Sequence, residues 1–345
     1  MSKIKALIFN FIQLFAVQTT ELNTTGNDLS PEMKTYYDMR LIDYAQAQLV
    51  HDQFGQKRPI PKNSGKQIEF RAFTPLPKAL TALTEGVTPA GNQLDVTTIT
   101  ATVAQYGDYI VQSDVLELTA LDNTILEATK LLGRQAGLTL DTITRNVLVS
   151  GTNVMYAPKI NASTGAETEV TSRANLDKTA VLTVDLVEQA ATELRAQNAP
   201  TINGDYVCIL HPYAAYDLMR DPDWRKPHEY VDTDNIYQGE LGKIGGVRFV
   251  SSTEAKIWRG TGCPSNLSVF ACLFIGEGAY GVTEVEGGGL QTIVKQKGSA
   301  GTADPLDQRS SVGWKAIKTA EILIQSYLIR LECCSSRYSA TAAAN

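Results

Sequence analysis

Two alternating stretches, joined by a long irregular segment, place the strongest constraint on what this chain can fold into. Residues 65–73 (GKQIEFRAF) and residues 95–114 (DVTTITATVAQYGDYIVQSD) alternate apolar and polar side chains, which is the pattern of a β-strand with one apolar face. Residues 74–92 between them are rich in Thr, Pro and Gly, so the whole region is predicted to form an extended hairpin. Because a two-stranded ribbon is marginally stable at best in water, this one must lie on something else.

The strongest helix is predicted directly after the hairpin. Thr124 and Glu127 have the spacing of a capping box, and Gly151 can end the helix. A helix of about 26 residues gives a rod of roughly 39 Å, long enough to act as the backbone of an elongated subunit. Gly133 and Gly137 are spaced as GxxxG, which indicates close approach of another backbone. The apolar stripe comprises Leu118, Leu121, Ile125, Leu132, Ala136, Ile143 and Val147.

The remaining chain mixes helices and strands in an irregular order. A second helix is expected over residues 185–198, ending at Ala199 and Pro200. The apolar runs YVCIL (206–210) and LSVFACLFI (267–275) are predicted strands, and a β-rich tail includes residues 312–332. This order favours an α+β fold over a doubly wound sheet.

Length and composition exclude several classes of protein. A chain of 345 residues suggests roughly two domains. The net charge of −6, with acidic and basic residues interspersed, does not predict a basic face for nucleic acid or membrane. Five cysteines without a CxxC, two of them adjacent as Cys333 and Cys334, argue against a disulfide scaffold and favour a reducing compartment.

The octapeptide FNFIQLFA at residues 9–16 follows two lysines and has three interpretations. A secretory signal cut after Ala16 would need a small residue at position 14, the third position before the cut, but that position holds the bulky Leu14. The apolar run is too short to span a bilayer as a helix. Asn10 and Gln13 share one side of a helix and leave Phe11, Ile12 and Phe15 on another, which suits docking on a protein surface. An interaction arm is favoured over a signal peptide.

Gly276–Gly281 (GEGAYG) is a literal GxGxxG after a predicted strand, so a dinucleotide-binding oxidoreductase is the main catalytic alternative. The fingerprint must open a helix and be followed by an acidic residue about 20 positions later. Here the continuation alternates like strands and contains three consecutive glycines. A turn between strands is the preferred interpretation.

No other motif predicts a catalytic, cofactor or metal site. Residues 232–235 (DTDN) begin like a calcium loop, but Tyr237 and Lys243 occupy the positions that need Gly and Glu. The three histidines lack helical partners for zinc, and His211 after an apolar strand is expected to be structural. Asp221 and Asp223 around Pro222 are expected to form a solvated turn. The remaining histidines are His51 and His228. The densest basic cluster suits contact with a neighbouring acidic surface at least as well as contact with phosphate, and it comprises Lys57, Arg58, Lys62 and Lys66.

The order of elements and three longer runs resemble one family. FNFIQLFA, residues 191–224 (ATELRAQNAPTINGDYVCILHPYAAYDLMRDPDW), residues 242–258 (GKIGGVRFVSSTEAKIW) and residues 304–323 (DPLDQRSSVGWKAIKTAEIL) are similar to major capsid proteins of tailed bacteriophages with the Hong Kong 97 fold. The resemblance extends over nearly the whole chain. It implies a structural protein, not an enzyme, that self-assembles into the icosahedral shell around a double-stranded DNA genome.

The resemblance also implies a division of the chain and a set of partners. The expected parts are an N-terminal arm (1–54), an extended loop (55–112), a peripheral domain with the long helix (113–181), an axial domain (182–261), a return to the peripheral domain (262–310) and a C-terminal β segment (311–345). The expected partners are copies of the chain in hexamers and pentamers, with scaffolding, portal and decoration proteins as further candidates. The packaged DNA would be enclosed without sequence-specific binding, and no membrane would be involved. The protein would be located in the virion capsid and, during assembly, in the host cytoplasm, where FNFIQLFA would be kept as an assembly arm.

Overall fold

The computed structural model describes residues 49–61, 65–73, 76, 78–80, 82, 85–86, 88, 91–119, 124–161, 163–228, 240–284, 288–299 and 304–345. These residues fall into two units. Of the described residues, the first unit contains those in 108–133 and 292–314, and the second contains those in 44–107, 134–291 and 315–345. Helix α4 (Thr124–Val149) and strand β15 (Arg309–Ile322) each begin in the first unit and end in the second.

The core of the second unit is a mixed sheet of seven strands within the described residues. The order is β5-β16-β12-β8-β10-β9, with β11 paired to β12. Strands β8 and β12 are buried along their whole length because both are continuous apolar runs inside the sheet. The bounds are β5 Val154–Tyr156, β8 Tyr206–Leu210, β9 Glu240–Ile244, β10 Val247–Ser251, β11 Ile257–Trp258, β12 Val269–Ile275 and β16 Leu328–Cys333. The α+β prediction is therefore confirmed.

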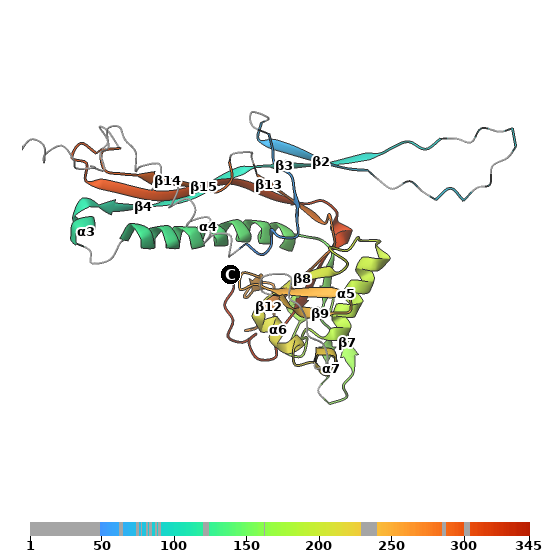
Figure 1. The fold of residues 1–345 in the computed structure, drawn as a ribbon. Helices are drawn as coiled ribbons and strands as arrows, with labels where there is room; N and C mark the ends of the chain where they lie inside the picture. The colour runs from blue at the N-terminus through green and yellow to red at the C-terminus, as the bar shows by residue number, and fades with distance from the viewer. Residues whose placement is uncertain are drawn as a thin grey trace, which may run out of the picture. The chain divides into compact units, whose positions relative to one another are not determined.

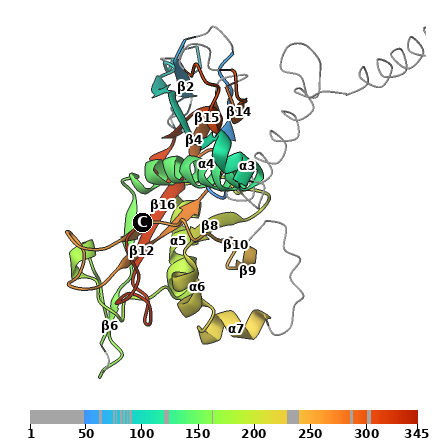
Figure 2. The same ribbon diagram turned by 90° about the vertical axis from the view of Figure 1, so that its left-hand side faces the viewer.

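Helix α5 (Val184–Ala196) packs on this core through one apolar face. The helix starts one residue earlier than predicted because Thr183 is its N-cap and accepts a hydrogen bond from the Leu186 N–H. Two short helices, α6 (Pro212–Leu218) and α7 (Pro222–His228), follow β8, and Figure 2 shows α5 and α6 beside that strand. The buried face of α5 comprises Val184, Leu186, Val187, Ala190, Ala191 and Leu194.

A second sheet in this unit joins β1 (Gln56–Lys57), β13 (Tyr280–Glu284) and the later half of β15. Strand β1 is parallel to β13, and β13 is antiparallel to β15. Its apolar residues share one buried cluster with the end of α4: Tyr280, Val282, Ala320, Ile322, Leu148 and Val149. Strands β6 (Lys159–Ile160) and β7 (Glu167–Thr168) form a separate small hairpin.

The predicted hairpin is confirmed by strands β2 (Gln67–Phe73) and β3 (Val96–Thr102). They pair antiparallel from Gln67 opposite Thr102 to Phe73 opposite Val96, and Figure 1 shows them side by side. The expectation of one strand over residues 95–114 is wrong, because the chain breaks at Val103 and continues as β4 (Ala104–Ser113). Because β2 begins only at Gln67, opposite Thr102, the residues after Val103 have no partner on β2, and β4 pairs with β15.

The first unit contains α3 (Asp114–Thr119), the start of α4, most of β4, and β14 (Gln291–Lys295) except its first residue. Strands β4 and β14 both pair with β15. Gly313 of β15 permits the close approach of β4, since a Cβ atom there would lie 2.7 Å from Cβ of Tyr109 and 2.9 Å from the Asp108 carbonyl oxygen.

The predicted long helix is confirmed as α4, which has 26 residues. Leu132 and Ala136 of the predicted stripe are buried, as are Gly133 and Gly137. Ile125, Ile143 and Val147 are half-buried. The buried positions run through Ala128, Leu132, Ala136, Leu140, Thr144 and Leu148, which repeat every four residues.

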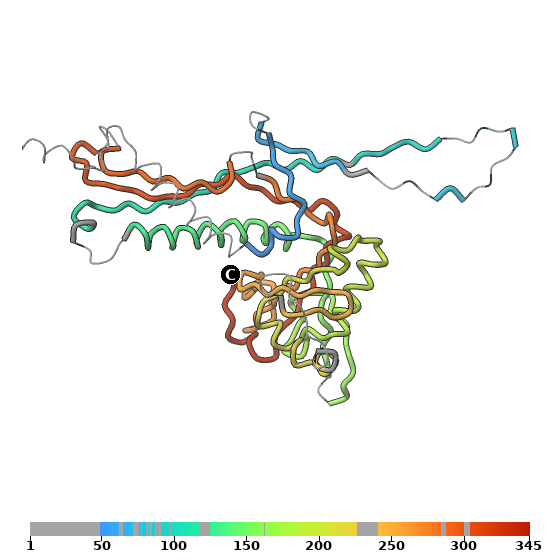
Figure 3. The backbone as a smooth tube through the Cα atoms, viewed as in Figure 1, coloured from blue at the N-terminus to red at the C-terminus, as the bar shows by residue number. Residues whose placement is uncertain are grey.

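The chain closes on the second unit through a docked tail. Arg259 donates hydrogen bonds to the carbonyls of Ala342 at 2.6 Å and Ala340 at 3.0 Å, and Tyr338 stacks on Tyr213 with ring centroids 4.3 Å apart. Figure 3 traces this tail in dark red to the chain end. Within the part of the chain that the structure describes there are also two 3-10 turns, η1 (Arg173–Asn175) and η3 (Gln325–Tyr327).

Several predictions lie outside the described residues. They are the octapeptide at 9–16, nearly all of the N-terminal arm, and the calcium-like residues 232–235. Among the helices that the structure describes, none is long and apolar enough to cross a membrane.

Replacing Leu194 with Ala tests the packing of α5. The side chain is fully buried in the core, so its truncation should lower the free energy of unfolding by about 2 to 5 kcal/mol. Thr192→Ala, on the exposed side of the same helix, should change it by less than about 0.5 kcal/mol. Urea denaturation followed by circular dichroism measures both, and equal effects would contradict the assigned faces.

Candidate functional site

The ribbon, which comprises strands β2 and β3 and the segment that joins them, has one region covered by the subunit and one exposed region. Phe70 of β2 is 4% exposed and Ala101 of β3 is fully buried. In the segment between the two strands, Leu80 is 86% exposed and Leu94 is 70% exposed. Among the described residues of the ribbon, the exposed large aliphatic ones are Leu76, Leu80, Leu94 and Val96. Exposed large apolar side chains on one extended element make that element a candidate for contact with another molecule.

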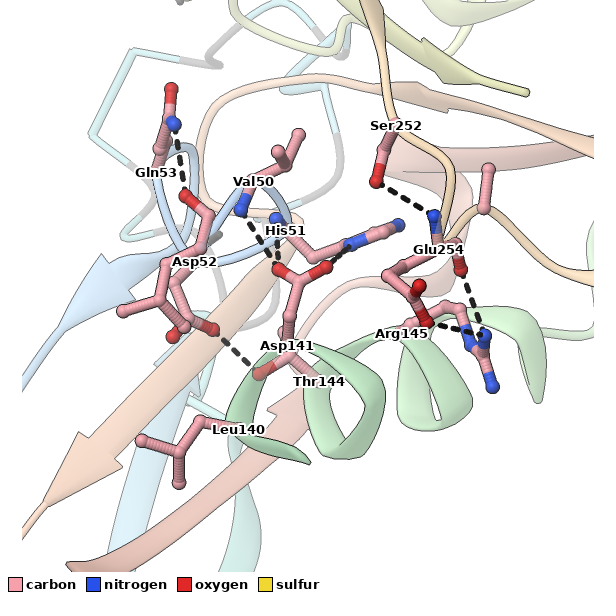
Figure 4. Close-up of polar contacts among 12 residues, drawn as sticks. Val50, His51, Asp52, Gln53, Leu140, Asp141, Thr144, Arg145, Ser252 and Glu254 are labelled. Carbon is pink, nitrogen blue, oxygen red and sulfur yellow. Dashed lines mark hydrogen bonds and ion pairs between the residues drawn. The ribbon is translucent and has the colours of Figure 1, made fainter. Parts of the chain in front are cut away.

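A turn at residues 50–54 anchors the chain just before the ribbon. Asp141 of α4 accepts hydrogen bonds from the backbone N–H groups of Val50 and His51, both at 2.8 Å, and from the His51 ring at 2.7 Å (Figure 4). Both side chains of the His51–Asp141 pair are fully buried. Because a carboxylate can only accept, the proton of the ring bond is on Nδ1 of His51.

A second set of bonds holds the same turn from other elements. Asp52 accepts hydrogen bonds from Thr144 of α4 at 2.6 Å and from Lys318 of β15. Lys318 also donates to the Leu140 carbonyl at 3.1 Å. The Tyr280 hydroxyl of β13 donates to the His51 carbonyl, so α4, β13 and β15 all bind this turn.

The electrostatics of this anchor keep its donors and acceptors in fixed roles. Burial raises the pKa of Tyr280 well above its usual range, and the Asp52 carboxylate acts in the same direction. The hydroxyl therefore stays protonated and remains a donor. Arg145, one turn from Asp141, donates to the Glu254 carbonyl at 2.8 Å, which ties α4 to the loop after β10 (Figure 4).

Sequence reasoning missed the anchor residues, although one signal was present. Buried and half-buried positions alternate along β15, and Lys318 occupies a buried one. A charged residue in an apolar register needs a partner of opposite charge. The even-numbered residues of β15 from position 312 are all buried, and they are Val312, Trp314, Ala316, Lys318, Ala320 and Ile322.

The GxGxxG residues form a turn between β12 and β13, as the sequence predicted. Gly278 has φ of 73°, which glycine adopts without strain. Gly281 already lies within β13, so no helix opens after the motif and the helix N-terminus that a pyrophosphate needs is missing.

The other candidate residues, His211, Asp221 and His228, each lie at the end of a different helix or in a loop. His211 is the N-cap of α6, where its Nδ1 accepts a hydrogen bond from the Tyr213 N–H at 3.1 Å. Asp221 uses its two oxygens to accept bonds from the Val184 and Asp223 N–H groups. His228 is the last residue of α7. The structure does not bring these residues together.

The basic cluster and the cysteines show no catalytic arrangement. Lys57, Arg58 and Lys66 are exposed, and Lys62 lies outside the described residues. All five cysteines are free thiols, and the sulfur atoms of Cys272 and Cys333 lie 3.9 Å apart. Within the described ranges, no group of three or more His, Cys, Asp or Glu residues could hold a metal ion.

The sequence matches a model of a protein family described as phage capsid protein over residues 3–272. That match covers well over half of the chain. A search of curated proteins found no match.

Solved phage capsids have the same fold at low sequence identity. The capsid of Ralstonia phage GP4 aligns with a TM-score of 0.64 at 14% identity, covering 92% of this chain and 96% of that chain. Cyanophage P-SCSP1u gives 0.61 at 16% identity, covering 82% and 87%. The capsid of cyanophage Pam1 gives 0.60 at 13% identity, covering 93% and 98%. The predicted Hong Kong 97-type fold is therefore confirmed.

Replacing Asp141 with Ala tests the anchor. It would leave two backbone N–H groups and the His51 ring without their acceptor in a buried site, so the free energy of unfolding should fall by about 3 to 5 kcal/mol. Asp141→Asn keeps one acceptor oxygen and should cost less. Asp95→Ala, on an exposed residue, is the control and should change stability by less than about 0.5 kcal/mol. Chemical denaturation measures all three, and a neutral Asp141→Ala would refute the anchor.

The pH dependence of folding tests His211. Burial lowers the pKa of His211 to about 4, below its usual value of about 6.5. As pH falls from 6.5 to 4, the unfolded chain binds a proton that the folded chain resists, so stability should fall in that window and not above it. His211→Asn keeps an N-cap acceptor but cannot titrate, and should lose less stability over the same window. Parallel pH profiles of the two proteins in urea denaturation would contradict this role.

Proposed function

The chain belongs to the phage capsid protein family, and we propose that its ribbon is the element that binds a neighbouring subunit in the shell. The family assignment makes the chain a structural major capsid protein that self-assembles, as predicted from its sequence. The oxidoreductase alternative, which was based on Gly276–Gly281, has no support among the families and structures that this chain matches.

The exposed aliphatic residues of the ribbon carry this proposal. Leu80 and Leu94 have most of their surface open to water in the isolated subunit. Burying an exposed leucine contributes about 1.5 to 3 kcal/mol, and a two-stranded ribbon cannot provide that burial itself. A second copy of this chain is the available cover, because the subunit functions in a shell of identical copies.

The anchor supports the same role from the other end of the segment. The turn at residues 50–54 is bound by α4, β13 and β15, so the chain enters the ribbon from a fixed position. Load placed on the ribbon by a neighbour would be transmitted to the second unit at this point. A binding element mounted on a rigid scaffold loses less conformational entropy when it binds.

The division of the chain extends this proposal. Residues 1–54 would be the arm, 55–112 the extended loop, 113–181 and 262–310 the peripheral domain, 182–261 the axial domain and 311–345 the C-terminal β segment. The confirmed ribbon and the confirmed helix α4 support the second and third assignments. Copies would meet as hexamers and pentamers around the axial domain.

The environment and other partners also belong to the proposal. Assembly in the host cytoplasm agrees with five free thiols. A net charge of −6 agrees with a container that encloses double-stranded DNA without gripping it, since phosphate binding needs cationic groups. Scaffolding, portal and decoration proteins are candidate partners on the family resemblance alone.

Replacing Leu80 and Leu94 with Ser tests the ribbon contact. Both side chains are exposed, so the melting midpoint of isolated subunits should move by no more than a few degrees, given about 2 to 4 °C per kcal/mol for a domain of about 150 to 250 residues. Closed shells should no longer form, because the apolar contact with the neighbour is lost. Sedimentation velocity and negative-stain microscopy measure assembly.

The matched control is Leu306→Ser, which removes a leucine of similar exposure outside the ribbon. It should leave both the melting midpoint and shell formation unchanged. Normal shells from the Leu80 and Leu94 variant would overturn the ribbon assignment. Wild-type protein that stays monomeric at high concentration would count against self-assembly itself.

A further inference from the structure

Gly281 lies at the centre of the β1–β13–β15 sheet. Its partner on β1 is Gln56 and its partner on β15 is Glu321. Its neighbours Tyr280 and Val282 belong to the buried apolar cluster that includes the end of α4. Because successive residues of a strand face opposite sides, Gly281 faces the other side of the sheet.

The ring of Phe70 occupies the space where a side chain at Gly281 would be. A Cβ atom built on Gly281 would lie 2.9 Å from both Cε1 and Cζ of Phe70, and 3.5 Å from Cδ1 of Leu323. Real Cβ atoms essentially never come this close to another atom, so a side chain at residue 281 would force the Phe70 ring to shift from its place on β13.

This face of the sheet is covered at the same place. Glu321, which faces the same side as its partner Gly281, is half-buried, and desolvation raises the pKa of its carboxyl group. Phe70 itself is 4% exposed. The ring therefore makes a closed contact with the sheet and is not resting against solvent.

The contact between Phe70 and β13 constrains the direction of both strands of the ribbon, because Phe70 is paired within the β2–β3 ladder. Phe70 pairs with Ile99 at the middle of the seven-residue ladder between β2 and β3. A strand rises about 3.3 Å per residue, so a tilt of about 10° at Phe70 would displace a point about 30 Å farther out by about 5 Å. A displacement of that size would separate two contacting surfaces.

We propose that Phe70 and Gly281 form a socket that sets the direction of the ribbon, and that both are positioning residues for shell assembly. The proposal rests on the proposed function, in which the ribbon binds a neighbouring subunit. It also explains why a glycine stands at position 281, the last position of the GxGxxG sequence that resembles a dinucleotide-binding fingerprint. The last glycine of that motif is required by the aromatic ring that packs on it.

The socket is tested by adding one methyl group and then making room for it. Gly281→Ala should force the Phe70 ring to shift, and the yield of closed shells should fall at least tenfold while the subunits remain folded. Phe70→Leu combined with Gly281→Ala removes the overlapping ring atoms and should restore most of that yield. A substitution that merely weakened the sheet would not be rescued by a smaller residue at position 70.

The control is Gly91→Ala, because a Cβ atom on Gly91 meets nothing within 4 Å and the residue belongs to the same hairpin. It should assemble like the wild type. Circular dichroism and thermal melting report subunit folding, and sedimentation with negative-stain microscopy reports closed shells. If Gly281→Ala does not fold, Phe70→Ala replaces it, since that variant empties the socket without overlap and should give folded subunits with defective shells.

The outcomes separate this inference from the function on which it rests. Normal shells from Gly281→Ala, or from Phe70→Ala where that variant is used, overturn the socket and leave the capsid role intact. Failure of Phe70→Leu to rescue Gly281→Ala also overturns it, because the defect would then have another cause. If the wild-type protein forms no shells under any condition, the proposed function fails first.

Discussion

A two-stranded ribbon cannot bury both of its ends by itself, and the arrangement of this subunit follows from that limit. One region is covered within the subunit, where Phe70 lies on β13. The region around Leu80 has no such cover among the described residues. If a neighbouring subunit covers these leucines as proposed, the ribbon gains apolar burial only when the shell assembles.

The hydrogen bonds of the anchor fix the position of the turn at residues 50–54 more specifically than an apolar contact would. Burying Asp141, Asp52 and Lys318 costs desolvation free energy, and a well-packed apolar cluster of equal volume could stabilise the fold as much. Hydrogen bonds differ from apolar contacts because they have direction. Asp141 binds two successive backbone N–H groups, so the turn at residues 50–54 cannot slide by one residue without breaking these bonds.

Local patterns predicted the elements of this fold and could not predict how distant segments meet. The ribbon, α4 and the strands β8 and β12 each follow from periodicity within one stretch of sequence. The break at Val103 was missed because it depends on where the opposite strand ends. The anchor was missed because His51 and Asp141 are 90 residues apart, although Lys318 in an apolar register signalled an unknown partner. The GxGxxG motif was correctly predicted as a turn, but the steric reason for Gly281 came only from the position of Phe70.

If the ribbon binds a neighbour as proposed, stability and assembly depend on different parts of the chain. The seven-stranded sheet and α5 bury the largest apolar cluster and can hold the second unit together without a neighbour. The ribbon adds little to that core, so its sequence is free to be adjusted for contact with another copy. Contacts of a few exposed aliphatic side chains are individually weak and reversible, so a misplaced subunit can leave before many contacts accumulate. A shell built from a stable core and weak repeated contacts can therefore correct its errors while its subunits stay folded.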